Sequence, residues 1–445
     1  MSANNRKMTL LSLAIPILIE QILRSLMGTV NTFMLSRFSD DAAAAVGVAN
    51  QVLNVMNMFS TMLASGAAVL INQNLGAGRD RDAARVTMVS LSASFLFGTA
   101  FSALALIFSD DVVRLMGLNG ALAADAAAYL RVVGASCVIQ FMSATLASHF
   151  RCRGKAQVAM AVIVFNNAVN LLGSWLVVHE RLPLRGVAGI ATVRLISETL
   201  GLTAILALFA REKWGQRAAD LLRLREGKLG QIVSLGFMSG LEGISYMSAQ
   251  LVTTRFITSL PTAVLSAKVY TQSVNNYTYM AGYAVGMAAQ ILCGHLIGAG
   301  RNDEAMRLIR RSWSYTLALN LAFSFAFYAF SARIVGLFTD SAEIQGIART
   351  LFMIDIVTCT GRSMNHSYNF GLRSAGYVFW PMIIASASIW LLQVGAGYLF
   401  TVTAGLGVVG LWIGQALDEW VRGVTFTRIW LSRRWTRTSV VKPAE

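Results

Sequence analysis

The sequence predicts an all-α polytopic membrane protein, with about twelve transmembrane helices in two pseudo-symmetric six-helix lobes. Three observations lead to this fold class: a strongly apolar composition, a series of long apolar runs, and a repeat that relates the two halves of the chain. Of the 445 residues, 55% are hydrophobic and 13% are charged, and the mean hydropathy is +0.57. Because a soluble domain has about 25% charged residues, the composition excludes an ordinary soluble protein.

The predicted spans are apolar runs long enough to cross about 30 Å of hydrocarbon, which takes about 20 helical residues. The first run carries Glu20 and Arg24 and shows no small-residue cleavage site, so we interpret it as a retained span rather than a signal peptide. In the first half the spans are 9–35, 44–72, 86–108, 125–148, 156–178 and 187–209. In the second half they are 231–257, 264–296, 312–332, 348–370, 377–400 and 406–431.

The runs divide the chain into an N-terminal lobe (1–210), a basic cytoplasmic linker (211–230), a C-terminal lobe (231–432) and a cytoplasmic tail (433–445). Basic residues gather at the N-terminus, in alternate connections and in the tail, and include Arg6, Lys7, Arg79, Arg81, Arg85, Arg151, Arg153, Lys155, the cluster from Arg211 to Lys228, Arg301, Arg307, Arg310, Arg311, Arg433 and Arg434. The other connections hold only a few, such as Arg37, Arg114, Arg181, Arg185 and Arg333. The positive-inside rule therefore predicts that both termini lie in the cytoplasm.

The net charge of +15 does not indicate a nucleic-acid partner, because the basic residues lie in short loops between apolar runs. The four cysteines, at 137, 152, 293 and 359, have no C-x-x-C spacing, so neither a disulfide framework nor a zinc site is expected. The sequence contains no recognisable nucleophile, base or metal cluster of an enzyme. Its Gly-Ala-Gly-Arg loops lack the spacing of a nucleotide-binding loop.

The two halves of the chain repeat one another. Gly-Ala-Gly-Arg at 76–79 recurs at 298–301, and the same shift of 222 residues maps Glu20 on Glu242 and Arg151 on Arg373. A shift of 221 maps Glu198 on Glu419. Six spans per half is an even number, so the copies have the same orientation. An axis along the membrane normal should relate them, as in transporters whose substrate site lies near the midplane.

Four glutamates lie about twelve residues, or about 18 Å at 1.5 Å per residue, from the start of their spans: Glu20, Glu198, Glu242 and Glu419. Arg24, Arg194 and Arg422 stand four residues from Glu20, Glu198 and Asp418, and such pairs share one helix face. A structural and a functional role are both open for these paired acids. Glu242 has no such neighbour, because Tyr246 stands where its repeat-mate has Arg24. We therefore expect Glu242 to be protonated, ion-bound, or paired across helices with a base such as Arg362 or Lys268.

Polar and aromatic side chains concentrate in corresponding spans of both halves, and we predict that they line a wet central cavity. Such side chains also serve as contacts between helices, worth about 0.6–2 kcal/mol each, so this second role stays open. Aromatic rings can hold organic cations over their faces. The predicted cavity residues are Asn31, Asn54, Asn167, Tyr246, Asn275, Asn276, Tyr279 and Arg362.

Several segments resemble the multidrug and toxic compound extrusion (MATE) family. They are LAIPILIEQIL at 13–23, INQNLGAGRDRDAARV at 71–86, GLEGISY at 240–246, HLIGAGRNDEAMR at 295–307, GRSMN at 361–365, GLRSAG at 371–376 and ALDEWVRG at 416–423. The resemblance covers essentially the full length. It implies a two-lobed, twelve-helix cation-coupled antiporter that exports bulky, often cationic organic compounds by alternating access. It also implies a cation-binding role for Glu242.

Two positions depart from the family's pattern. The family's Val-Asp-Thr late in the first span is Val30-Asn31-Thr32 here, and the aspartate about eleven residues before its R-x-A-G motif is replaced by Arg362. Asp355 lies two turns before Arg362 on the same face. The candidate cation-coupling residues are therefore Glu242, Glu20, Glu198, Asp355 and Glu419. The coupling ion is H+ or Na+, and the only metal site considered is Na+ at Glu242.

The expected function is secondary antiport that exports cationic or amphipathic organic compounds. We expect a monomeric multi-pass plasma membrane protein, in the inner membrane of a Gram-negative cell, without an organic cofactor. A flippase or exporter for a lipid-linked saccharide or a single endogenous metabolite remains the alternative. Such a carrier is expected to have a basic cavity, whereas acids and bases are mixed in these spans; the intramembrane bases that keep the alternative open are Arg24, Arg194, Arg362 and Lys268.

Overall fold

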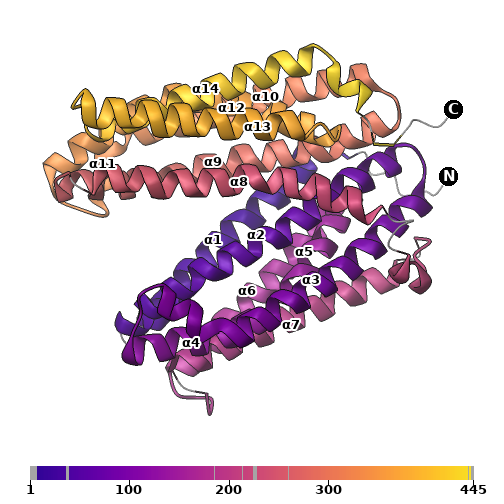
Figure 1. Ribbon diagram of the computed structural model, residues 1–445, viewed down its shortest axis with the longest axis horizontal. Coiled ribbons are helices and arrows are strands. Elements are labelled where there is room, and N and C mark those ends of the chain that lie inside the picture. Colours follow the sequence, from indigo (N-terminus) through magenta and orange to yellow (C-terminus); the bar gives the residue numbers. More distant parts are fainter. Residues whose placement is uncertain are drawn as a thin grey trace. The chain divides into compact units, whose positions relative to one another are not determined.

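A computed structural model describes residues 8–36, 40–184, 186–212, 214–223, 228–258, 260–438 and 440–441, and these residues are helical with no strand among them (Figure 1). Six basic residues used to predict topology lie outside the described residues: Arg6, Lys7, Arg37, Arg185, Lys213 and Arg225. The all-α prediction is confirmed. Each predicted span coincides with a helix or with a bent run of helices.

The helices of the first half are α1 (Leu10–Ser36), α2 (Asp40–Gly76), α3 (Asp80–Leu115), α4 (Gly120–Ala135), α5 (Cys137–Cys152), α6 (Ala156–Val178) and α7 (Gly186–Arg211). The fourth predicted span is the pair α4 and α5, which bends by 44° at Ser136. A short 3-10 helix, η1 (Ala218–Leu222), follows α7.

The helices of the second half are α8 (Leu229–Ile257), α9 (Thr262–Gly298), α10 (Asn302–Ala329), α11 (Ser331–Gly336), α12 (Ala342–Ser374), α13 (Phe379–Ser388) and α14 (Val408–Leu431). The π-helical segments η2 (Ile389–Ala396) and η3 (Leu399–Thr403) continue α13 through the eleventh predicted span. The chain's last described helix is the 3-10 turn η4 (Arg434–Arg437).

Seven of the described helices are long and apolar enough to cross a membrane, and the bent α4–α5 pair raises the number to eight. The other predicted spans, α8, α10, α12 and α14, are too polar to meet that criterion. In α12 and α14 the cause is a set of buried polar and charged side chains, among them Asp355, Arg362, Asp418 and Arg422. These helices are polar because they bury charge within the protein.

The chain divides into two compact units. The N-terminal unit is Ile19–Leu75 with Arg79–Phe237, and the C-terminal unit is Met1–Leu18, Gly76–Gly78 and Met238–Glu445. The predicted lobe boundaries after residues 210, 230 and 432 stay a prediction.

Helix α12 is the central element of the C-terminal unit, where it packs against α9, α10 and α14 (Figure 1). Its approach to α14 is close because both helices have glycine at the crossing. A Cβ on Gly361 would lie 2.8 Å from the Trp420 backbone nitrogen, and one on Gly423 would lie 2.7 Å from the Gly361 carbonyl oxygen. Small residues allow backbones this near in membrane helices. The crossing places the charged side chains of the two helices beside one another.

In the N-terminal unit, α3 packs on α4 and α5, and α7 packs on α4, α5 and α6. The chain after α7 folds back onto this unit. Ser92 on α3 donates a hydrogen bond to the Leu221 carbonyl oxygen at 2.7 Å, and the buried Asp220 carboxylate lies 3.7 Å from Arg85. The first part of the predicted linker is therefore an ordered element of the N-terminal unit.

A set of side chains that we name the linker clamp holds this segment in place. Glu212 accepts from Arg153 at 2.5 Å, shares a hydrogen bond with His149 at 3.3 Å, and pairs with Lys155. Trp214 is buried beside the His149 ring, with centroids 4.7 Å apart, and below the Arg153 guanidinium. Burial opposes ionisation of Glu212, but its hydrogen bonds to His149 and Lys155 and the Arg153 charge lower its pKa to about 2.

Candidate functional site

Glu242 lies in the middle of α8 and pairs across helices with α12. Its Oε2 is 2.6 Å from Arg373 Nη2, and its Oε1 accepts from Asn369 Nδ2 at 3.1 Å. A second arginine, Arg422 on α14, lies 3.9 Å from Oε1. The predicted pairing across helices is confirmed, but neither of the two bases named as examples, Arg362 and Lys268, is the partner. Arg362 bonds another glutamate, and Lys268 donates to Thr254 Oγ1 at 2.8 Å.

The other acids of α14 extend this group of ion pairs. Glu419 accepts from Arg362 Nε at 3.1 Å and from Asn365 Nδ2 at 2.8 Å. Asp418 binds Arg422 at 2.5 Å, which confirms the predicted pair. We call the three carboxylates Glu242, Asp418 and Glu419 and the three guanidinium groups Arg362, Arg373 and Arg422 the C-terminal charge network. It is balanced in charge.

Asp355 lies outside that network. It is 3% exposed, and both of its hydrogen bonds come from neutral groups. The Trp412 Nε1–H donates to Oδ2 at 3.2 Å, and the Asn275 side-chain amide donates to the same oxygen. Within the described part of the chain no basic side chain lies at salt-bridge distance from Asp355. Of the five candidate coupling carboxylates, Asp355 is thus the one that is buried without a basic partner.

The two glutamates of the N-terminal unit are also ion-paired. Glu20 accepts from Arg151 Nη1 at 3.0 Å on both oxygens, and the predicted Arg24 pair is confirmed at 3.1 Å. Glu198 binds Arg194 at 3.1 Å, which confirms the second predicted pair.

Glu198 also accepts from two residues of the α4–α5 region. Ser136 Oγ donates at 2.7 Å and Gln140 Nε2 at 3.2 Å. Arg194, besides binding Glu198, donates to the Tyr129 hydroxyl at 2.9 Å.

The same contacts recur in both units at positions related by the repeat. Arg151 and Arg373 bind Glu20 and Glu242, and each pair is separated by 131 residues. Gln140 and Arg362 are related by the same shift, and they bind Glu198 and Glu419. In each unit the fourth span therefore anchors the glutamates of the first and sixth spans. The sequence register contained this signal, because it aligned Arg151 with Arg373 as well as the two glutamates.

The predicted cavity residues are placed in several environments. Asn275 and Arg362 bind carboxylates, Asn167 donates to the Leu23 carbonyl oxygen at 3.0 Å, and the Tyr246 hydroxyl accepts from Gln250 at 2.7 Å. The remaining four are the exposed Asn54 and Asn276, the Tyr279 ring, which contacts His366 and Tyr283, and the buried Asn31, whose Oδ1 has no hydrogen-bond partner in the described residues. A common cavity for all eight stays a prediction.

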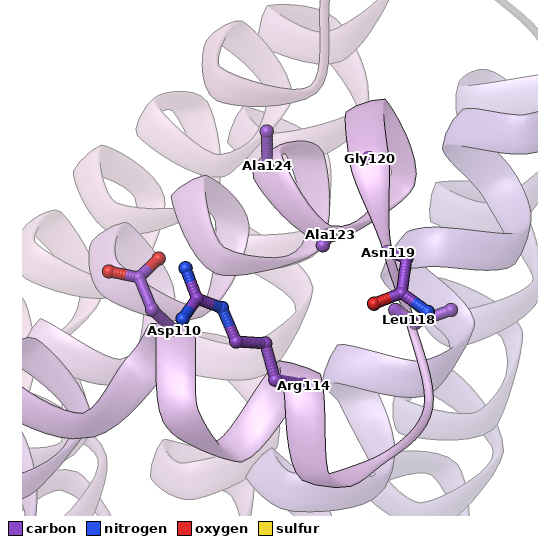
Figure 2. Close-up of a pocket in the computed structure, with 7 residues that line it drawn as sticks. All are labelled: Asp110, Arg114, Leu118, Asn119, Gly120, Ala123 and Ala124. Atoms are coloured by element: carbon purple, nitrogen blue, oxygen red, sulfur yellow. The ribbon is translucent and has the colours of Figure 1, made fainter.

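A pocket of about 390 Å³ lies elsewhere, at the connection between α3 and α4 (Figure 2). Figure 2 shows Asp110 and Arg114 on one side of this pocket and Asn119 on the other. Leu118 is its only large apolar side chain. Sites for organic ligands are lined mainly by apolar and aromatic groups, so we assign no substrate to this pocket.

No group of three or more His, Cys, Asp or Glu side chains that could hold a metal ion occurs in the described part of the chain. The four cysteines are free and buried.

Comparison with known proteins identifies the family. The MatE family model matches residues 16–176 and 239–399, which is more than half of the chain and falls once in each half. The chain belongs to the MATE family. The two matches confirm the recognised resemblance, and MATE proteins are secondary transporters rather than enzymes. The protein is accordingly a multi-pass membrane transporter.

Relatives match this MATE transporter over nearly its whole length. The uncharacterized transporter YisQ of Bacillus subtilis is 33% identical over 434 residues, covering 97% of this chain and 95% of YisQ. The probable multidrug resistance protein NorM of Thermotoga maritima is 23% identical, with coverage of 97% and 94%.

Solved structures share the fold. An outward-facing multidrug resistance MATE family transporter of the MOP superfamily has a TM-score of 0.88 at 22% identity, with 95% of each chain covered. A MOP superfamily transporter from Pyrococcus furiosus, described as having a binding pocket of reverse polarity, has a TM-score of 0.82 at 20% identity, again with 95% of each chain covered.

Proposed function

We propose that this MATE transporter is an antiporter that exports amphipathic organic compounds, including cationic ones, in exchange for H+ or Na+ by alternating access. Membership of a transporter family supports export. The two six-span repeats support alternating access. In transporters built from parallel repeats, the substrate site lies near the bilayer midplane between the repeats, and rocking of one repeat against the other opens it to one side of the membrane at a time.

The observation that carries ion coupling is the environment of Asp355. Asp355 lies within the predicted span 348–370. An ionised carboxylate inside a membrane span is costly unless a cation compensates it. The five other acids described above, in both units, have arginine partners, whereas Asp355 has only an indole and an amide as donors among the described residues. Its Oδ2 receives both donors, so Oδ1 is the oxygen left for a proton or a metal cation. We assign the coupling ion to Asp355.

Glu242, the leading candidate from the sequence, then acts through the C-terminal charge network. An ion can bind Glu242 only when Arg373 moves away, because that guanidinium occupies Oε2 at 2.6 Å. We propose that Glu242 and Glu419 exchange arginine partners between access states. Glu20 is bound by Arg151 and Glu198 by Arg194. We propose that these two glutamates also exchange partners between access states, within the N-terminal unit.

The alternative of a lipid-linked saccharide or single-metabolite carrier loses part of its support in this arrangement. Two of the four bases that favoured it, Arg194 and Arg362, are compensated by Glu198 and Glu419. A compensated guanidinium offers little net charge to a phosphorylated ligand. We propose further that the protein is a monomer in the plasma membrane, the inner membrane in a Gram-negative cell, with both termini cytoplasmic.

The test is uptake of rhodamine 6G into proteoliposomes under an imposed proton or sodium gradient. Asp355→Asn keeps the side-chain size but cannot load an ion. We expect the rate of gradient-driven uptake to fall at least tenfold, which corresponds to about 1.4 kcal/mol. Dye exchange without a gradient should persist. The gradient that drives wild-type uptake identifies the ion.

The matched control is Asp110→Asn, which changes an exposed aspartate that pairs with Arg131 at the far end of α3. It should behave as wild type. Gradient-driven uptake by Asp355→Asn at the wild-type rate would remove Asp355 from the coupling mechanism. Equal uptake by the wild type with and without every gradient would instead contradict antiport.

A further inference from the structure

Arg24 on α1 is far more exposed than the other arginines that bind the carboxylates of the spans, which are Arg151, Arg194, Arg362, Arg373 and Arg422. It lies 14 residues after Leu10, about 21 Å along the helix at 1.5 Å per residue. Its side chain is 55% exposed, whereas that of its partner Glu20 is 4% exposed. A guanidinium at the centre of a span does not face hydrocarbon without a large cost, so it faces water.

Arg24 is also surplus to the local charge balance. Both carboxylate oxygens of Glu20 already accept hydrogen bonds from Arg151 Nη1, at 3.0 Å each. In the N-terminal unit, the two span carboxylates Glu20 and Glu198 are bound by three guanidinium groups. These are on Arg24, Arg151 and Arg194. Together these carboxylates and guanidinium groups have an excess of one positive charge, whereas the C-terminal charge network is balanced.

The repeat shows that the fold does not need a cation at this position. The equivalent of Arg24 is Tyr246, and the Glu242–Arg373 pair forms beside it without help from its own helix. Arg151 anchors Glu20 in the same way that Arg373 anchors Glu242. The architectural contact is therefore complete without Arg24, and the arginine needs another explanation.

The chemistry of Arg24 points to an acidic ligand. A guanidinium has five N–H donors in a planar fork that fits a carboxylate, sulfonate or phosphate through two parallel hydrogen bonds. In the described residues Arg24 uses one donor atom, Nη2, on Glu20 Oε1. Asn31, two turns further along the same face of α1, is uncharged, so this face carries no second acid that would compete with the ligand for Arg24.

We propose that Arg24 binds an anionic group of the transported molecule, so that the substrates include acidic and zwitterionic amphiphiles as well as cationic ones. This inference rests on the proposed export function and specifies its substrate class. Replacement of the family's first-span aspartate by Asn31 acts in the same direction, since it removes a negative charge from the face that Arg24 shares.

Two dyes with one xanthene core test the proposal: sulforhodamine 101, which carries sulfonates, and rhodamine 6G, a cation. Binding to the purified protein in phosphatidylcholine vesicles is measured by fluorescence anisotropy, and uptake is measured under the gradient that drives transport. We expect Arg24→Gln to weaken sulforhodamine 101 binding and uptake about tenfold, the effect of losing a charge-assisted contact. Rhodamine 6G should be unaffected or favoured. Arg24→Lys keeps the charge but loses the planar fork, so its sulforhodamine 101 binding should lie between that of the wild type and that of Arg24→Gln.

The matched control is Arg114→Gln, which removes an exposed arginine at the other end of the unit and should change neither dye. Wild-type sulforhodamine binding by Arg24→Gln, or equal loss of both dyes, would overturn the proposal. So would loss of the binding when phosphatidylglycerol is added to the vesicles, because the occupant would then be a lipid headgroup. Arg24-dependent binding without uptake of either dye would support the site and contradict the export function.

Discussion

Single residues in this protein owe their roles to partners that are distant in sequence. Glu242 lacks a basic neighbour on its own helix, yet Arg373 and Arg422 reach it from two other helices. Asp355 has Arg362 two turns away on its own helix, yet that arginine binds Glu419 instead. Loss of one partner from a buried pair leaves an uncompensated charge, which is worse than the absence of the pair.

Arg373→Gln tests this at the residue scale. It leaves Glu242 with Asn369 and with Arg422 at 3.9 Å, so we expect a stability loss of about 3 kcal/mol, typical of a broken buried pair. Thermal unfolding in detergent measures the loss. The control Arg311→Gln removes an exposed arginine that contacts Tyr315 and should leave the unfolding temperature unchanged. Equal stability of the two variants would show that Arg373 is not an anchor.

At the scale of elements, the end of the sixth span folds in a related way in both units. The shift of 221 relates Trp214 to Trp435 and Phe209 to Trp430. Trp435 stacks on Trp430 with centroids 4.2 Å apart and donates Nε1–H to its carbonyl oxygen at 2.9 Å. In the fourth span the shift is 222, so the position equivalent to His149 is Gly371, and a Cβ there would lie 3.2 Å from the Trp430 ring. The tryptophan that follows the sixth span therefore packs on the His149 ring in the N-terminal unit and on the Trp430 indole in the C-terminal unit.

Trp214→Ala tests the linker clamp as an element. Truncating a buried tryptophan costs about 3–5 kcal/mol in a well-packed site. We therefore expect a lower unfolding temperature and faster trypsin cleavage after the exposed Arg217. The matched control is Trp175→Ala, since Trp175 is 45% exposed and a smaller effect follows from its lesser burial. A linker that resists trypsin in Trp214→Ala as well as in the wild type would contradict the clamp.

At the scale of the molecule, the repeat organises the charged groups of both units. Each unit anchors one glutamate of its first span and one of its sixth span to its fourth span. The units differ in how charge is balanced: surplus arginine in the N-terminal unit and an uncompensated aspartate in the C-terminal unit. Under the two proposals made above, the units of this symmetric frame bind different ligands, an anionic group in one and a cation in the other.

The predicted topology can be tested because the four native cysteines are buried and should not react with a membrane-impermeant maleimide. Asn119→Cys lies in a connection predicted to be external, and Asp80→Cys lies in one predicted to be cytoplasmic; both positions are exposed. In intact cells we expect labelling of Asn119→Cys alone, and after permeabilisation labelling of both. The reverse pattern would invert the orientation given by the basic loops.

Properties that depend on neighbouring residues were available from the sequence. Apolar runs located the spans, the register located the two copies, and i,i+4 spacing identified the pairs of Arg24, Arg194 and Arg422. Each depends on helix geometry, which repeats every 3.6 residues and can be read locally. The family followed from the same local motifs.

The tertiary structure alone decided which arginine reaches which acid. Contacts separated by 131 residues depend on how helices cross, and the close α12–α14 approach at Gly361 and Gly423 determines that Arg362 meets Glu419. Once those pairs form, Asp355 is left with neutral donors and Arg24 is left exposed. A charged side chain inside a membrane is stable only where an oppositely charged or polar partner lies close to it. The distance between residues far apart in sequence is set by the fold, so the sequence alone could not give these pairs.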